Sequence, residues 1–469
     1  MSLPERLCQA GYRERSLSDL LRVEELYALR DAGPRTLCQE SAAAHLAAFW
    51  LLNQPRDREL LQGLMGAETL EELERLGLVA ATTPPGEGVP LEMTARALLF
   101  PCLGRCLFTD LFAPAVDPMV QVYWLGGDSM VLARATPRAP VRRALDLCTG
   151  SGVHAVLAAA HADEVWGVDV NARALEFSRI NARVNKVGEP CRFVQGSLYE
   201  PLPEGRFDLI TANPPFVPTP RGDLALFRPG GQTGEEVTRA IVGGLPERLE
   251  VGGTLTLVSQ HPVMRHSHVL DRVEGWLGGA AGWGLAYLVV CPIDRDDLIA
   301  SHLIPRLQFL AELGPEEGAR AYRREFERWL DSYAESGIVA ADLGLIYVRR
   351  LAPGHPGWRA EHRLPFPREP ISDWVQSWLD AQDRFSAPID WEWRPAWSPF
   401  CTRLRLDPRT GEGFVDRIPT LSPESAFLLE RADGARTARE LKEAFANRFG
   451  HKEGVAERLA ELARRALLR

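Results

Sequence analysis

The feature that most limits how this chain can fold is a series of short apolar segments that alternate with helical stretches over residues 117–351. Each segment has the length of one buried strand, and such an alternation is typical of a mainly parallel sheet covered by helices on both faces. We therefore predict an α/β domain with a seven-stranded sheet and a helical insertion near residues 296–337. The predicted strands are RALDLC, VWGVDV, CRFVQG, FDLITA, TLTLVS, LAYLVVC and LGLIYVRR.

The sequence on either side of this domain has a different pattern. A chain of 469 residues is longer than one core usually supports, so several domains are expected. Residues 1–116 have the apolar spacing of a mainly helical domain, and its last part has the order helix, Pro/Gly turn and extended stretch, which is compatible with a winged-helix-like unit. Residues 352–390 are rich in Pro, Gly and charge, which predicts a linker. Capping patterns at Ser422 and Thr437 predict helices in a small winged-helix-like domain over residues 391–469.

Net charge, hydropathy and cysteine spacing limit the classes of partner and ligand that we expect for this protein. The formal net charge of -9 gives no overall attraction to phosphate backbones, although it is compatible with a local basic groove. The longest apolar stretch, near residues 45–52, is far shorter than a membrane span. Cys102 and Cys106 form the only close pair among eight cysteines, without the second pair or the histidines that a zinc site needs. We therefore expect a cytoplasmic protein with no membrane segment and no metal.

A glycine-rich turn lies between the first predicted strand and a helical run, in the sequence Asp146-Leu-Cys-Thr-Gly150-Ser-Gly152. Glycine at positions 150 and 152 permits backbone conformations and a close ligand approach that a side chain would prevent. Asp169 ends the next strand, where its carboxylate can accept hydrogen bonds from both hydroxyls of a ribose. These elements predict a nucleoside cofactor, and they would fit NAD as well as S-adenosylmethionine (SAM).

The tetrapeptide Asn213-Pro214-Pro215-Phe216 follows the strand FDLITA and decides between these cofactors. Prolines fix the backbone and lack N–H groups, so their carbonyls are free to accept. The Asn213 side-chain oxygen and the Pro214 carbonyl can accept both hydrogens of a planar NH2 group, while Phe216 stacks on its flat face. The nitrogen lone pair is then directed at a methyl donor, so the motif predicts direct methyl transfer to an sp2 nitrogen.

At these residues the chain resembles the N-methyltransferases with an Asn-Pro-Pro-(Tyr/Phe/Trp) motif, especially release-factor glutamine N5-methyltransferases and their small-domain relatives that act on ribosomal RNA. The resemblance spans about residues 122–258 and includes NPPFVPTP, GGQTGEEVTRAIVGG and Gly127-Asp128-Ser129. It implies a Rossmann-like methyltransferase fold with SAM as the cofactor. The implied catalytic residues are Asn213, Pro214 and Phe216. The implied SAM-binding residues are Asp128, Asp146, Gly150, Gly152, Asp169, Ser197, Leu198 and Asn213.

The chain departs from this family in three respects. Phe216 replaces the commoner tyrosine and removes a hydroxyl that could position the substrate. Ser197 stands where relatives often have an aspartate near the adenine amino group, which weakens the implied contact. The large flanking domains are unlike the compact glutamine enzymes, and this puts the acceptor in doubt more than the chemistry.

The sequence leaves four hypotheses of function open, three of which name a methyl acceptor. The resemblance favours a glutamine of a protein substrate, such as a translation factor. An exocyclic amine of a flipped or single-stranded base in RNA or DNA would fit the same clamp. The remaining hypotheses are a small-molecule acceptor and a module that binds SAM without transferring its methyl group. A basic groove built from Arg221, Arg228, Arg239 and the Arg-rich insertion would favour nucleic acid.

Overall fold

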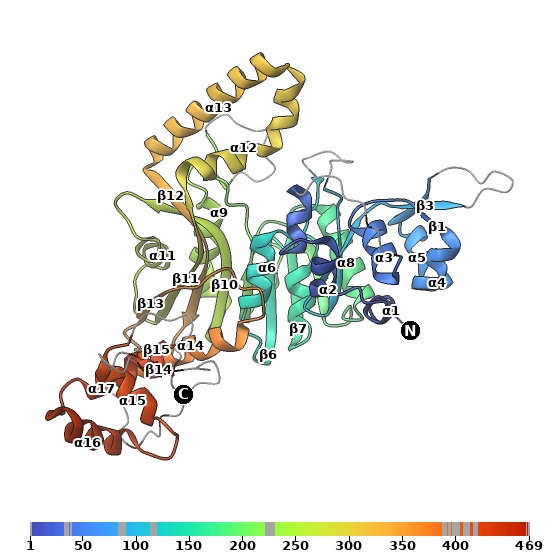
Figure 1. Ribbon diagram of the computed structural model, residues 1–469. Helices are drawn as coiled ribbons and strands as arrows, with labels where there is room; N and C mark the ends of the chain where they lie inside the picture. Colours follow the sequence, from blue (N-terminus) through green and yellow to red (C-terminus); the bar gives the residue numbers. More distant parts are fainter. Residues whose placement is uncertain are drawn as a thin grey trace.

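A computed structural model of the chain (Figure 1) describes much of the sequence. The described residues are 2–31, 37, 40–82, 91–112, 120–220, 230–386, 392, 395, 404–406, 413–415, 421–465 and 467.

The centre of the molecule is an eight-stranded sheet with the strand order β13-β11-β12-β10-β9-β6-β7-β8. Strands β8, β7, β6, β9 and β10 are parallel, while β12 runs antiparallel to both of its neighbours, β10 and β11. All seven predicted segments are strands. Their bounds, with the additional strand last, are β6 Val141–Leu147, β7 Ala162–Asp169, β8 Cys191–Gln195, β9 Phe207–Ala212, β10 Leu249–Met264, β11 Trp283–Asp294, β12 Ile338–Arg350 and β13 Trp358–Arg363.

The eighth strand corrects two predictions, because the expected sheet had seven strands and the expected linker covered residues 352–390. Within that range, β13 pairs with β11, and helix α14 (Ser372–Phe385) follows it. In β13 the half-buried residues Trp358, Ala360 and His362 alternate with exposed charged ones. This alternation is typical of an edge strand with one covered face. The linker prediction was wrong because the charged residues of β13 and the prolines and glycines beside it have the composition of a linker.

Helices cover both faces of the sheet. One face packs against α9 (Glu236–Gly243), α10 (Leu245–Arg248) and α11 (Val269–Leu277). The other face packs against α6, α7, α8 and α14. The bounds of the first three are α6 Gly127–Ala135, α7 Val153–Ala158 and α8 Ala172–Val184.

The N-terminal elements lie beside α6, α7 and α8 and share a hydrophobic core with them (Figure 1). Their small antiparallel sheet has the order β1-β3-β2, and β4 and β5 form a separate hairpin. The bounds are α1 Leu3–Gln9, α2 Glu14–Leu21, η1 Leu26–Asp31, α3 Ala42–Trp50, β1 Arg56–Asp57, α4 Arg58–Met65, α5 Ala67–Arg75, β2 Val79–Ala81, β3 Glu92–Ala95, β4 Leu98–Cys102 and β5 Arg105–Thr109.

Two further groups of helices complete the described chain. The insertion between β11 and β12 consists of α12 (Arg295–Glu312) and α13 (Pro315–Ser336), which project from the sheet (Figure 1). The C-terminal group packs on the end of α14 through Ala381 and Phe385. Its bounds are β14 Leu404–Leu406, β15 Gly413–Val415, α15 Pro423–Arg431, α16 Ala438–Phe449 and α17 Val455–Arg464. Over the described ranges, none of the helices has both the length and the apolar character needed to cross a membrane.

Candidate active site

The glycine-rich turn leaves the carboxyl end of β6 and leads into α7. Gly150 and Gly152 have φ values of 54° and 79°, in the left-handed region that favours glycine. A Cβ built on Gly152 would lie 2.9 Å from the Cα of Ser178 on α8, so the turn packs directly against that helix. A Cβ on Gly150 would meet nothing closer than the Cys148 carbonyl oxygen at 4.0 Å. The backbone at Gly150 therefore faces open space, where a ligand can approach closely.

Asp146 lies beneath this turn and is only 1% exposed. Its Oδ2 accepts hydrogen bonds from Thr149 Oγ1 (2.5 Å) and the Ala155 amide (3.2 Å), and its Oδ1 accepts one from Thr211 Oγ1 (2.8 Å). Burial raises the pKa of this carboxyl to about 7, although these hydrogen bonds oppose the shift. Asp146 therefore joins the turn to α7 and to β9 through contacts within the protein.

Asp169 joins the turn to the end of β7. Its Oδ2 accepts a hydrogen bond from the Gly150 amide (2.8 Å), and its Oδ1 accepts one from the Asn171 amide (2.9 Å). Burial raises the pKa of Asp169, and the backbone amides partly offset that effect. The structure thus brings two of the predicted cofactor elements into direct contact.

Ser197 and Leu198 lie in the loop after β8, beside the end of β7. The Gly196 amide donates to the Asp169 carbonyl (3.1 Å), which fixes the start of this loop. Ser197 is exposed, and Leu198 has a φ of 48°, which is uncommon for a residue with a side chain. The predicted cofactor residues after β6, β7 and β8 therefore lie at one edge of the sheet, where parallel strands end.

Asn213 follows β9 at the same edge, and its side-chain amide is held in one orientation. Its Nδ2 donates to Asp128 Oδ2 (3.0 Å) and to Ser129 Oγ (3.3 Å), both in the first turn of α6. An amide NH2 group has two hydrogens, so both are used and Oδ1 is left to accept from another group. Within the described residues, neither Asn213 Oδ1 nor the Pro214 carbonyl accepts a hydrogen bond.

The sequence did not predict either of these contacts. Asp128 is a predicted cofactor-binding residue, and in the structure its Oδ2 accepts a hydrogen bond from Asn213. Ser129 was not singled out, although it is adjacent to Asp128 in the Gly-Asp-Ser segment. The proximity of α6 to the end of β9 depends on packing between segments that are 85 residues apart in the chain.

The segment from Asn213 to Pro220, termed the acceptor loop here, is supported by the glycine loop Gly230–Gly234. The Gly230 amide donates to the Val217 carbonyl (3.0 Å), and the Thr219 amide donates to the Gly231 carbonyl (2.9 Å). A Cβ on Gly234 would lie 2.4 Å from the Phe216 carbonyl oxygen, so only glycine permits this approach. Phe216 is 7% exposed, and this packing fixes the position of its backbone.

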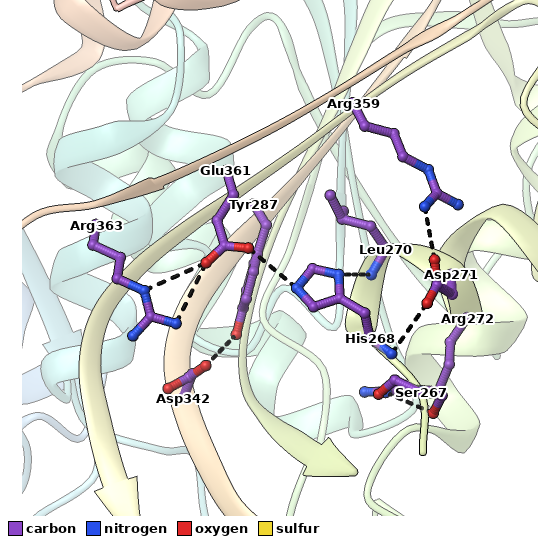
Figure 2. Close-up of polar contacts among 10 residues, drawn as sticks. All are labelled: Ser267, His268, Leu270, Asp271, Arg272, Tyr287, Asp342, Arg359, Glu361 and Arg363. Carbon is purple, nitrogen blue, oxygen red and sulfur yellow. Dashed lines mark hydrogen bonds and ion pairs between the residues drawn. The ribbon is translucent and has the colours of Figure 1, made fainter. Parts of the chain in front are cut away.

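His268, which follows β10, belongs to a polar network on the α11 face of the sheet (Figure 2). His268 caps α11, and its Nε2 lies 3.1 Å from Glu361 Oε2 on β13. Beside it, the Tyr287 hydroxyl donates to Asp342 Oδ2 (3.3 Å). Arg272 pairs with Glu235, the residue after the glycine loop. The network therefore joins β13, α11 and α9, and the residues that the structure describes contain no group of His, Cys, Asp and Glu arranged for a metal.

The hypothesis of a basic groove can be compared with the structure only in part. Arg221 and Arg228 lie outside the described residues, while Arg239 is exposed on α9. On α13, Arg320 lies 3.6 Å from Glu316, and Arg328 lies 2.8 Å from Glu325. That helix has four arginines and six carboxylates, so the Arg-rich insertion has no excess of positive charge along α13.

The family match of this region agrees with its sheet and its glycine-rich turn. Residues 126–276 match the family model described as methyltransferase small domain. The α/β sheet with the glycine turn at the end of β6 is accordingly a Rossmann-like methyltransferase domain.

Curated relatives that match include glutamine methyltransferases. The chain is 37% identical over 141 residues to the ribosomal protein uL3 glutamine methyltransferase of Bradyrhizobium diazoefficiens, which covers 28% of this chain and 44% of that protein. It is 37% identical over 142 residues to the release factor glutamine methyltransferase of Geobacter sulfurreducens, covering 27% and 48%. The chain thus spans less than half the length of either relative.

Solved structures of methyltransferases also match. One is a T. thermophilus 16S rRNA N2 G1207 methyltransferase in complex with AdoMet and guanosine, with a TM-score of 0.28 and 20% identity, over 52% of this chain and 65% of that one.

Proposed function

We propose that this chain is a SAM-dependent N-methyltransferase that methylates the side-chain amide of a glutamine in a protein. The observation that supports this most directly is the fixed orientation of Asn213. Because Asp128 and Ser129 accept from its Nδ2, its Oδ1 and the Pro214 carbonyl are left as two acceptors. A primary amide offers two N–H hydrogens in one plane, which matches this pair.

The residues of the glycine turn fit the cofactor. The open backbone at Gly150 would accept the methionine part of SAM, Asp169 would accept from its ribose, and Ser197 with Leu198 would lie beside its adenine. When bound, SAM supplies a sulfonium methyl group, which moves to the acceptor nitrogen as the C–S bond breaks and leaves its electron pair on sulfur.

Catalysis by the protein would consist of positioning. Asn213 Oδ1 and the Pro214 carbonyl would hold the acceptor NH2 group so that its lone pair faces the methyl carbon. The same two oxygens would stabilise positive charge as it develops on the nitrogen, which then releases one proton to water. No covalent bond to the enzyme is required.

Two observations favour a protein acceptor over nucleic acid. The relatives named above are glutamine methyltransferases, at 37% identity over the domain. The arginines of α13 are balanced by carboxylates on the same helix, which gives no basic path for a phosphate backbone.

The test is transfer of tritium from methyl-labelled SAM into lysate of a strain that lacks this protein, with wild type compared with Asn213→Ala. Label that depends on Asn213, resists ribonuclease and is lost on protease treatment is the expected result. Purified uL3 and release factors of the same organism are then assayed, with mass spectrometry to locate methylated glutamine. Ribonuclease-sensitive label would move the acceptor to RNA, and no label would contradict transfer to a macromolecule.

A control measurement separates acceptor effects from cofactor effects. Asn213→Ala should bind SAM with nearly the wild-type Kd in calorimetry, while Asp169→Ala should bind it more weakly. Equal loss of SAM binding in the two variants would contradict the assigned roles.

A further inference from the structure

The helical insertion packs directly against the acceptor loop. It begins where β11 ends and returns where β12 begins, and Figure 1 shows α12 and α13 side by side above that end of the sheet. A separate hydrophobic cluster joins the two helices to Val217 of the acceptor loop and to Met264 at the end of β10. The fully buried members are Leu298, Ile299, Leu303, Trp329, Tyr333, Ile338 and Ala341.

A chain of polar contacts passes through this apolar cluster. The Tyr333 hydroxyl on α13 donates to the Pro218 carbonyl of the acceptor loop at 3.5 Å. His302 on α12 lies with Nδ1 3.1 Å from the same hydroxyl and Nε2 3.0 Å from the terminal amide of Gln260 on β10. The hydroxyl has one hydrogen, so its donation to Pro218 requires the His302 ring proton on Nδ1 and the NH2 group of Gln260 facing Nε2. The loop is therefore linked through the insertion to the central sheet.

These groups are buried, so their protonation states are constant over the physiological pH range. Burial lowers the pKa of His302 to about 4 and raises the pKa of Tyr333. Both side chains are therefore neutral near pH 7. Trp329 packs between them, with ring centroids 5.6 Å from His302 and 5.9 Å from Tyr333. The arrangement fixes a position and does not respond to pH.

The acceptor loop is thus held from two sides. The glycine loop accepts and donates backbone hydrogen bonds at Thr219 and Val217, and Tyr333 contacts Pro218 between them. Phe216 and Pro214, which would contact the acceptor, directly precede this held segment. A shift of about 1 Å at a reacting group can lower a rate about 100-fold, so support at Pro218 bears on the chemistry.

We propose that the insertion positions the acceptor loop, with Tyr333 as the positioning residue and His302 as the group that orients its hydroxyl. This inference rests on the proposed function for its effect on catalysis. Its structural part concerns the order of residues 213–220 alone and can be measured without an acceptor.

The experiment compares full-length wild type, Tyr333→Phe and the control Tyr322→Phe by hydrogen exchange and mass spectrometry. Tyr322 also lies on α13 against the same cluster, so its variant deletes a hydroxyl from the same helix. Loss of the Tyr333 hydrogen bond should raise exchange at the Thr219 and Gly230 amides by about fivefold, since one such bond is worth about that factor. Exchange in the hairpin β4–β5 should stay at the wild-type level, and Tyr322→Phe should match wild type throughout.

A second variant keeps the inference testable if Tyr333→Phe folds poorly. His302→Phe retains a ring against Trp329 but removes both nitrogens, so it should raise exchange at the same two amides. For both variants we expect an unchanged Kd for SAM and a kcat about tenfold lower with any acceptor that wild type methylates.

Two results would overturn the inference: wild-type exchange at Thr219 and Gly230 in Tyr333→Phe, or an increase that extends equally to β4–β5. If wild type methylates no acceptor, the proposed function fails while the exchange comparison still decides the role of the insertion. If exchange rises as expected but kcat is unchanged, positioning by Tyr333 is refuted for catalysis.

Discussion

At the scale of single residues, the orientation of one amide decides what the site can do. The side-chain amide of Asn213 has two flipped orientations, and only the one that donates from Nδ2 to Asp128 and Ser129 leaves Oδ1 to accept from a substrate. A carboxylate accepts only, so Asp128 fixes which end of the amide faces it. We therefore predict that Asp128 orients Asn213, whereas the resemblance implies a contact with the cofactor.

The two roles of Asp128 predict different outcomes for Asp128→Ala. If it orients Asn213, kcat for methyl transfer should fall about 100-fold while the Kd for SAM stays near wild type, because the amide is free to turn. Stopped assays give kcat, and calorimetry gives the Kd. Ser129→Ala is the matched control, with a smaller loss because its contact is longer. A large rise in the Kd of Asp128→Ala would instead support the cofactor role.

The two glycines of the turn form a second test at this scale. Gly152→Ala combines a φ of 79° with a Cβ 2.9 Å from Ser178, so we expect a loss of about 1–3 kcal/mol in the free energy of unfolding. Gly150→Ala places its Cβ in open space and should lose less stability, but it should weaken SAM binding where the backbone approaches the cofactor. Urea unfolding and calorimetry on both variants measure the contrast. Stronger SAM binding to Gly150→Ala than to Gly152→Ala, at equal stability, would contradict this assignment.

At the scale of elements, α8 connects the N-terminal unit to the glycine-rich turn. The side chain of Asn181 accepts from the Phe108 amide (2.7 Å) and donates to the Phe108 carbonyl (2.9 Å) and to the Ser151 carbonyl (2.8 Å). Asn185 makes the corresponding pair of bonds to Cys106 one turn later. The two asparagine side chains thus form hydrogen bonds with backbone N–H and C=O groups of β5, as a neighbouring strand would.

Asn181→Ala should be strongly destabilising, because it leaves buried backbone groups of β5 and the turn without partners. We expect a loss of about 3 kcal/mol in the free energy of unfolding, measured by urea denaturation. Glu176→Ala, at an exposed site on the same helix, should cost less than about 0.5 kcal/mol. Similar losses in the two variants would show that Asn181 does not hold β5.

Elements with a local signal were predictable from the sequence, and contacts between distant segments were not. The alternation of apolar segments gave the seven strands, and the pattern Thr437 with Glu440 is the observed capping box of α16. The edge strand β13 was missed because its apolar residues are single and separated by charges. The winged-helix-like character of the two terminal domains stays a prediction.

The residues of the candidate site also differ in whether the sequence alone could identify them. Gly150, Gly152, Asp169 and Asn213 could be selected because each lies at the carboxyl end of a strand or shortly after it. Ser129 and Tyr333 could not, because their contacts with the acceptor loop depend on how α6 and α13 pack. Sequence position alone does not determine that packing.

At the scale of the whole molecule, one buried cation joins three parts of the chain. Arg134 on α6 donates to Glu25 through Nη1 (3.1 Å) and Nη2 (2.9 Å), and its Nη1 also donates to the Pro367 carbonyl (2.8 Å). It also pairs with Glu14 on α2. The N-terminal unit and the segment before α14 therefore both fix α6, the helix whose first turn orients Asn213.

The molecule also buries several neutral histidines, which makes its stability depend on pH. Burial lowers the pKa of His154 on α7 to about 3, with the nearby Arg138 cation as a second cause. Burial also lowers the pKa of His261 to about 3 and that of His302 to about 4. In the unfolded chain a histidine titrates near 6.5, so below that pH the unfolded state binds protons that the folded state does not.

The contribution of His154 to this dependence can be isolated with His154→Leu. Because the folded pKa lies below the unfolded one, the stability contribution is complete above pH 6.5 and is lost as pH falls toward 3. Between pH 7 and pH 5, the free energy of unfolding of wild type should fall by about 2 kcal/mol more than that of the variant, since each pH unit below 6.5 costs about 1.4 kcal/mol. Urea unfolding at half-unit pH steps measures the free energy of unfolding of both proteins against pH. Because His261 and His302 are present in both proteins, their effects cancel in the difference. Parallel curves would mean that His154 is protonated in the folded protein at pH 5, which would require water or a carboxylate to reach a side chain that is 5% exposed.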